Sequence, residues 1–211
     1  ATAVANDFEW KVVHNRIEKM HKRLSDGMRN RDIASELRVL RETIDDGVKE
    51  QMIYRYPQEK SNVLKNWKVS WAPILSSFPS ADKDIIAGVD LWALDHSTAS
   101  VFHFMRVLEH GLRALTTDVG VKFDIQNWQN VIDEIEAEIR KLGKTLPRGA
   151  AKSDRLQFLS EAAKEFVYFK DGWRNYASHN RVAYDEHQAR SVLEHVRSFM
   201  NGLAAKLKEV P

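Results

Sequence analysis

Cysteine is absent from this sequence of 211 residues, which excludes disulfide bonds, thiolate catalysis and cysteine-ligated zinc. No apolar run is long enough to span a membrane, and no signal-peptide pattern opens the sequence. An excess of charge of one sign is also lacking, because the formal net charge is only +2 and does not by itself indicate a nucleic-acid partner. We therefore expect a cytoplasmic protein that does not engage a membrane.

Hydrophobic residues make up 43% of the sequence and charged residues 29%, proportions that are ordinary for a globular protein with a core. Nearly every segment repeats its apolar residues with the period of a helix, and no segment shows the alternation of a strand. We find no internal repeat. The sequence therefore predicts an all-α protein.

Apolar stripes and polar breaks divide the chain into two predicted parts. In 1–79, two amphipathic helices form a hairpin around the polar stretch 25–31, and the segment 54–78 is expected to form short helices and turns whose aromatic side chains pack on a larger body. In 80–211, four amphipathic helices with short links are expected to form an up-down bundle, to which the first part adds a helical layer. The helices are expected to begin near Ser80, Asp124, Ser153 and Asp185.

The stretch between the last two predicted helices holds side chains that suit phosphate chemistry. Arg174 can direct two N–H groups onto phosphate oxygens and stays charged. His179 can take or give a proton near neutral pH, and Asn175 can orient it or bond a phosphate oxygen. Metal-free cleavage of RNA needs a base, an acid and a cation at the phosphate. We therefore predict that these three residues form a catalytic site.

The spacing of Arg174 and His179 is not specific by itself. Inside a helix, an offset of five residues turns two side chains about 140° apart, so they cannot meet at one ligand atom. Arg174 and His179 span a predicted helix end, where the chain can bend, and Gly172 weakens the helix just before it. Arg181 and His187 span the same junction and stay an alternative. An Arg followed five or six residues later by a His occurs four times: Arg16/His21, Arg174/His179, Arg181/His187 and Arg190/His195.

The stretch Trp173-Arg174-Asn175-Tyr176-Ala177-Ser178-His179 resembles the Arg-Asn-x-x-x-His signature of HEPN domains, a nucleotide-binding family of higher eukaryotes and prokaryotes. The segment 102–113 is similar to the first HEPN helix, with Glu109 at the acidic position and Arg113 at the basic one. The resemblance covers roughly 87–208 and implies a four-helix bundle without a cofactor. Many HEPN domains are metal-independent ribonucleases, and the resemblance implies a homodimer in which two motifs share one cleft.

Arg181 stands two residues after the motif histidine, where the toxins of nucleotidyltransferase-paired modules carry a Tyr. This departure argues against control by transfer of AMP onto a tyrosine. We expect Arg181 to contact the substrate, together with Glu109 and Arg113.

Two other groups of polar residues leave alternatives open. One group lies near one face of the predicted helix 102–113 and forms either a phosphate-tracking stripe or a solvated polar face. Its members are His103, Arg106, His110 and Arg113. The other group, His14, Glu18 and His21, has offsets that suit a transition metal. Three ligands on one helix make an incomplete site, so we predict no bound metal.

The sequence thus predicts a homodimeric HEPN-type ribonuclease that cuts RNA by attack of the 2′-hydroxyl. The resemblance implies a setting in bacterial stress response, phage defence or a toxin system, with an antitoxin or another regulatory protein as a partner. The alternative is a HEPN-like module that binds RNA, a nucleotide or a protein without turnover.

Overall fold

The computed structural model describes residues 11–49, 55–124, 127–174 and 183–209. The chain divides into two compact units, Ala1–Arg55 and Tyr56–Pro211, and each is described by itself. Every regular element in these described ranges is a helix, which confirms the all-α prediction. Among the described helices, none combines the length and the apolar character that a membrane crossing requires.

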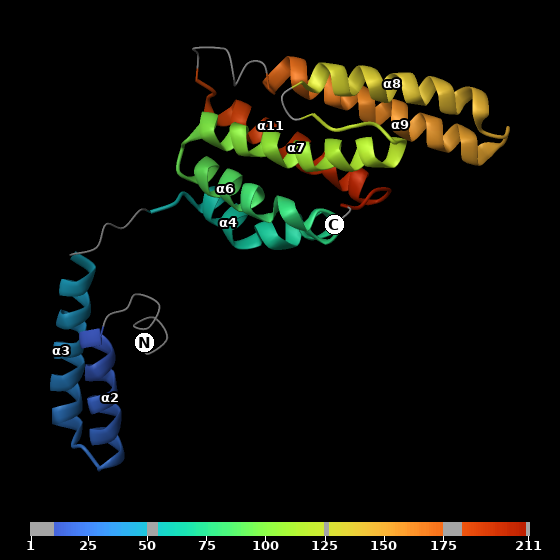
Figure 1. Cartoon of the computed structure of the whole chain (residues 1–211). Coiled ribbons are helices and arrows are strands. Elements are labelled where there is room, and N and C mark those ends of the chain that lie inside the picture. The colour runs from blue at the N-terminus through green and yellow to red at the C-terminus, as the bar shows by residue number, and fades with distance from the viewer. Residues whose placement is uncertain (1–10, 50–54, 125–126, 175–182, 210–211) are drawn as a thin grey trace. The chain divides into compact units, whose positions relative to one another are not determined.

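The first unit contains a helical hairpin, as the sequence predicts. Helix α2 (Lys11–Ser25) and helix α3 (Asn30–Lys49) run side by side (Figure 1). Gly27 turns the chain between them with a φ of 83°, a left-handed conformation that costs glycine little. Val13 is buried on α2, and no described residue of α3 is buried. The hairpin therefore has little core of its own.

The second unit contains the remaining helices. They are α4 (Gln58–Ser70), α5 (Ala72–Ser77), the 3-10 helix η1 (Pro79–Ala81), α6 (Asp82–Ala93), α7 (Ser97–Val119), α8 (Trp128–Thr145), α9 (Ala150–Phe169), the π-helical turn η2 (Lys170–Arg174) and α11 (Glu186–Ala204). Helix α7 lies between α6 and α11, and α8 packs along α9 (Figure 1).

Short polar side chains explain where several of these helices begin. At the start of α11, the Asp185 side chain accepts the Gln188 backbone N–H, and the Gln188 side chain accepts the Asp185 N–H, so that the two residues form a capping box at the predicted helix start. Asn127 caps α8 by accepting the N–H of Asn130 at 3.1 Å. Gly120 ends α7 with a φ of 78°. These local bonds satisfy backbone groups that a helix end leaves without partners.

The Pro- and Trp-containing segment is anchored on the core, as predicted. Trp71 is buried and stacks on Phe104 of α7, with 5.9 Å between the ring centroids. Trp67 packs against the same core. Since α4 and α5 belong to the unit Tyr56–Pro211, this compact unit begins earlier in the chain than the predicted part 80–211.

A cluster of aromatic rings joins α8, α9 and α11. Phe166 meets Trp128 edge to face at 6.1 Å and Phe199 at 5.0 Å. Phe169 contacts Phe199 at 5.3 Å and continues the cluster toward the end of α9. The cluster therefore anchors the end of α9, directly before the predicted motif.

Candidate functional site

The predicted catalytic motif begins at the end of the π-helical turn η2. Arg174 is the last residue of this turn. Asn175, His179 and Arg181 lie outside the described residues, so the roles of all four stay predictions. π-Helical turns are rare in proteins as a whole, but those that occur are often found at functional sites. Such a turn widens the helix and redirects the side chains that follow.

Residues on both sides of the motif segment are hydrogen bonded to each other. The Tyr184 hydroxyl donates to the Trp173 carbonyl at 2.9 Å, and the Tyr184 N–H donates to Thr98 Oγ1 at 2.9 Å. The Trp173 ring packs against Phe169 at 5.3 Å and His195 at 5.4 Å. Trp173 and Tyr184 are therefore held together beside the first turn of α7.

Arg113, one of the predicted substrate residues, is exposed on α7 and lies over the Phe123 ring at 4.2 Å. It lines an open hollow of about 510 Å³ that also contains Lys122 and Glu134. Glu109 is half-buried on the same helix. At 1.5 Å per residue, Glu109 lies about 16 Å along α7 from Thr98 and Arg113 about 22 Å. The contact of Glu109 and Arg113 with a substrate stays a prediction.

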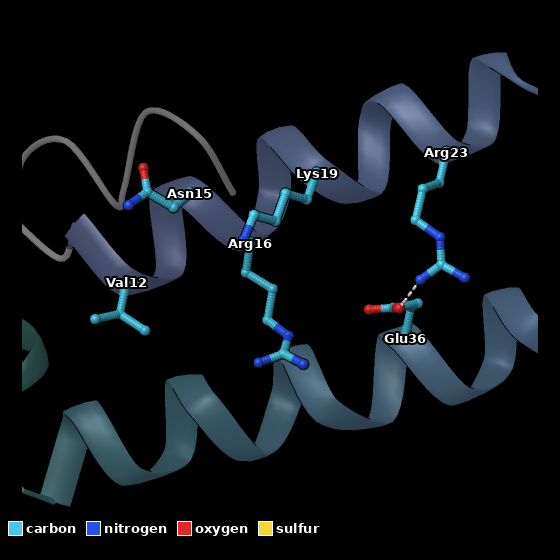
Figure 2. A pocket seen from close by; sticks show the side chains of 6 residues that line it. All are labelled: Val12, Asn15, Arg16, Lys19, Arg23 and Glu36. Carbon is cyan, nitrogen blue, oxygen red and sulfur yellow. Dashed lines mark hydrogen bonds and ion pairs between the residues drawn. The ribbon is translucent and has the colours of Figure 1, made fainter.

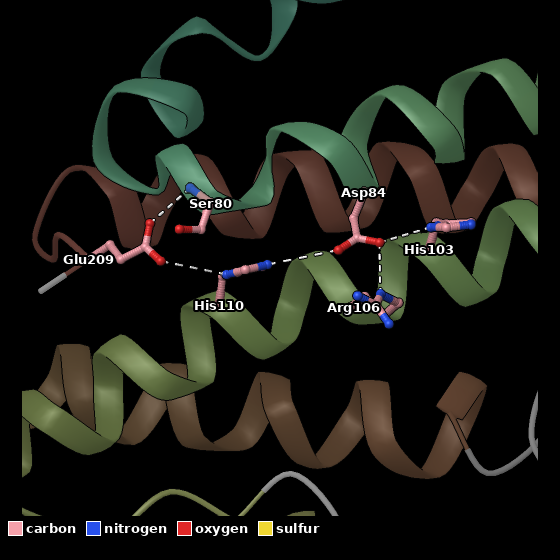
Figure 3. Close-up of polar contacts among 6 residues, drawn as sticks. All are labelled: Ser80, Asp84, His103, Arg106, His110 and Glu209. Atoms are coloured by element: carbon pink, nitrogen blue, oxygen red, sulfur yellow. Dashed lines mark hydrogen bonds and ion pairs between the residues drawn. The ribbon is translucent and has the colours of Figure 1, made fainter. Parts of the chain in front are cut away.

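The polar face of α7 matches neither alternative, a phosphate-tracking stripe or a solvated polar face. Figure 3 shows that it turns toward Asp84 of α6, a carboxylate whose side chain is only 10% exposed. His103 Nδ1 lies 2.9 Å and Arg106 Nε 2.7 Å from Asp84 Oδ1. His110 Nε2 lies 3.9 Å from Asp84 Oδ2. Three of the four residues of this face are thus committed to contacts with α6.

Glu209 extends the same polar network to the last described residues of the chain (Figure 3). His110 Nδ1 lies 3.8 Å from Glu209 Oε1, and the Ser80 N–H donates to Glu209 Oε2 at 3.0 Å. The Glu209 N–H donates to the Ser77 carbonyl at 2.7 Å. The network therefore links α7, the start of α6 and the residues that follow α11.

Two pKa values in this network are displaced. Burial alone would raise the pKa of Asp84, but hydrogen bonds from His103 and Arg106 outweigh burial and hold it below its ordinary value. Burial also lowers the pKa of His110, and the carboxylates of Glu209 and Asp84 oppose this without reversing it. The shift of the Asp84 pKa favours the ionised carboxylate, and the shift of the His110 pKa favours the neutral imidazole.

The competing pair Arg190 and His195, which lies inside a helix, does not converge, as its offset predicts. Arg190 pairs with Glu194 at 3.1 Å, whereas His195 Nδ1 faces the Ser191 carbonyl at 3.1 Å. Both residues thus have separate partners.

The metal hypothesis also finds no support in the described part of the chain. His14 Nε2 pairs with Glu18 at 3.3 Å. Across the described ranges, no group of three or more His, Asp or Glu side chains is placed to hold a metal ion. The offsets in α2 therefore produce an ion pair between neighbouring turns.

A basic groove in the first unit was missed by the sequence analysis (Figure 2). This α2 groove has a volume of about 380 Å³ and lies between α2 and α3. It is lined by Val12, Asn15, Arg16, Lys19, Arg23 and Glu36. The signal that could have found it is the offset of three and four residues from Arg16 to Lys19 to Arg23, which puts three cations on one helix face.

No protein-family model, no curated protein and no solved structure matches this chain.

Proposed function

We propose that the chain is a homodimeric HEPN-like ribonuclease that cuts RNA without a metal. The observation that carries the proposal is the sequence of residues 174–179, which begins at the last residue of the π-helical turn η2 and whose flanking residues Trp173 and Tyr184 are hydrogen bonded to each other. Such a segment leaves a rigid helical scaffold at a fixed point, and this is the placement that a catalytic loop needs.

In the proposed reaction, the ribose 2′-oxygen attacks the adjacent phosphorus and the bond to the 5′-oxygen of the next nucleotide breaks. His179 takes the proton of the 2′-hydroxyl, and the leaving 5′-oxygen takes a proton from His179 of the partner subunit. Arg174 stabilises the charge that develops on the phosphate, and Asn175 orients His179. The products are a 2′,3′-cyclic phosphate and a 5′-hydroxyl.

The proposal includes the remaining predicted residues and the setting. Glu109, Arg113 and Arg181 contact the RNA around the cleaved phosphate, and no cofactor takes part. The protein acts in the cytoplasm, in a stress, phage-defence or toxin system with an antitoxin or another regulatory partner. The resemblance of the motif supports these points.

The test is cleavage of a broad RNA panel in EDTA by the wild type, His179→Ala and Arg174→Ala. We expect each substitution to lower the rate roughly 100-fold or more, since a general acid–base group and a phosphate-binding cation each contribute on that scale. The matched control is His187→Ala, which removes an exposed histidine of the alternative pair and should leave the rate unchanged. Equal loss in His187→Ala would move the site to Arg181 and His187, and an inactive wild type would favour a binding module.

A further inference from the structure

The α2 groove carries an uneven distribution of charge. Helix α2 contains five Lys or Arg residues and one Glu, whereas α3 contains four Lys or Arg and five Asp or Glu. The net charge of the whole chain is only +2, so the basic character is concentrated on α2. A local excess of this kind attracts anions even where the overall charge does not.

Figure 2 shows that Arg16 reaches from α2 toward α3 and that Arg23 meets Glu36 across the hairpin. Glu36 is the one carboxylate that lines the groove. Within the described ranges, Arg16 and Lys19 form no ion pair, although both line the groove. Two cations without a carboxylate partner attract anions, so the groove is suited to a ligand that supplies acceptor oxygens.

The three cations follow one another along the helix axis. At 1.5 Å per residue, Arg16 and Lys19 are offset by about 4.5 Å, and Lys19 and Arg23 by about 6 Å. A row of separate cations about 10 Å long fits a chain of phosphates better than a single compact anion. Arginine can direct two N–H groups onto one phosphate, and lysine adds a point charge.

We infer that the α2 groove binds the phosphodiester backbone of RNA through Arg16 and Lys19. This inference rests on the proposed ribonuclease function and adds a second contact site for its substrate, far along the sequence from residues 174–179. Contacts of this type position an RNA chain without reading its bases, so binding at the groove is independent of sequence.

The test measures binding of a labelled single-stranded RNA to the full chain by fluorescence anisotropy between 50 and 200 mM salt. All proteins carry His179→Ala and all samples contain EDTA, so that RNA cleavage does not interfere with the measurement. The test variant is Arg16→Ala with Lys19→Ala. The control, Arg38→Ala with Arg41→Ala, removes the same charge from exposed positions of α3 outside the groove.

We expect the test variant to raise Kd roughly tenfold at low salt and to lower the slope of log Kd against log salt by about 1.4, the value for two lost single-strand phosphate contacts. The α3 control should keep a slope close to that of the parent. Lys19→Glu, a single change at an exposed position, should weaken binding without disturbing the hairpin, which circular dichroism checks.

Equal slopes in the test variant and the α3 control would overturn the inference, as would an absence of RNA binding by the parent. Competition by polyglutamate at equal affinity would also overturn it, because the groove would then take an acidic protein segment. The ribonuclease proposal can fail separately. If the wild type binds RNA through the groove but never cleaves it, the groove inference stands and the catalytic role of residues 174–179 does not.

Discussion

At Asp84 one buried carboxylate faces three side chains of the neighbouring helix α7. Two of them, His103 and Arg106, share Asp84 Oδ1, and His110 lies beside Oδ2. A buried charge is tolerated only when such partners replace water. The network therefore ties α6 to α7 by directional bonds in addition to apolar packing.

Replacing Asp84 by Asn should lower the free energy of unfolding by about 1–3 kcal/mol, because a neutral amide cannot satisfy the guanidinium of Arg106 and the imidazole of His103 together. Urea denaturation measures the change. Asp82→Asn is the matched control, because it removes the same charge from the same helical turn, where the residue is less buried. Equal losses in the two variants would contradict the role of the network.

The lowered pKa of His110 predicts that the stability of the protein depends on pH. This pKa is lowered by burial from an ordinary value of 6.5, so the unfolded chain binds the proton more readily than the folded one. The stability that neutral His110 contributes is therefore fully present above pH 6.5. It is lost as the pH falls through the lower pKa that His110 has in the folded chain. Asp84, whose pKa is lowered from 3.8, adds a loss in the same direction at more acid pH.

The measurement is the unfolding free energy of the wild type and of His110→Gln between pH 7.5 and 5. The wild type should lose more stability on acidification than the variant. Parallel curves, or a steeper loss in His110→Gln, would show that the imidazole is not held in its neutral form.

At the scale of the elements, the hydrophobic period predicts the helices where one face is buried, as in α8, whose Trp128, Val131 and Ile135 point into the core. The positions of helix ends were harder to predict. Helix α8 begins at Trp128 and not near Asp124, and α9 begins at Ala150, before Ser153. Ser80 lies in η1 and does not cap α6. Short polar residues are common outside caps, and only the backbone path decides which one accepts a hydrogen bond.

Helix α6 approaches α7 closely at Gly88, whose carbonyl accepts the Ser100 hydroxyl of α7 at 2.7 Å. A Cβ atom built there would lie 2.8 Å from Phe104 Cε1, on a buried ring that is itself stacked on Trp71. The ring has little room to move, so Gly88→Ala should destabilise the protein by about 1–3 kcal/mol despite the better helix propensity of alanine.

Gly202→Ala on α11 is the counterpart, because a Cβ at Gly202 would meet nothing within 4 Å. This substitution should stabilise the protein by up to about 1 kcal/mol. Thermal denaturation of both variants would check the pair, and a neutral effect at Gly88 would show that α6 and α7 can separate without loss.

At the scale of the whole molecule, the two units differ in the core that each contains. Every buried hydrophobic residue of the described ranges except Val13 belongs to Tyr56–Pro211. We therefore expect a protein of residues 56–211 to unfold in one cooperative transition, with a Tm within about 5 °C of the full chain. Calorimetry measures this, and a broad transition with dye-binding apolar surface would contradict the prediction.

The candidate site was predictable only in part. Residues 174–179 were identified because a family signature is a property of sequence alone. The contacts of Asp84 and the α2 groove were not identified, since they depend on how one helix is rotated against the next, and periodicity does not report rotation between polar faces. The row of Arg16 and Lys19 is hard to recognise in the sequence because the apolar stripe of α2 dominates its pattern.

The proposed function requires residues 174–179 to catalyse metal-independent attack of the ribose 2′-hydroxyl. Mass spectrometry of the RNA ends formed in EDTA by the wild type and by His179→Ala tests this step. We expect 2′,3′-cyclic phosphate and 5′-hydroxyl ends with the wild type and none above background with the variant. Ends with a 3′-hydroxyl and a 5′-phosphate, or cyclic ends formed equally by His179→Ala, would contradict it.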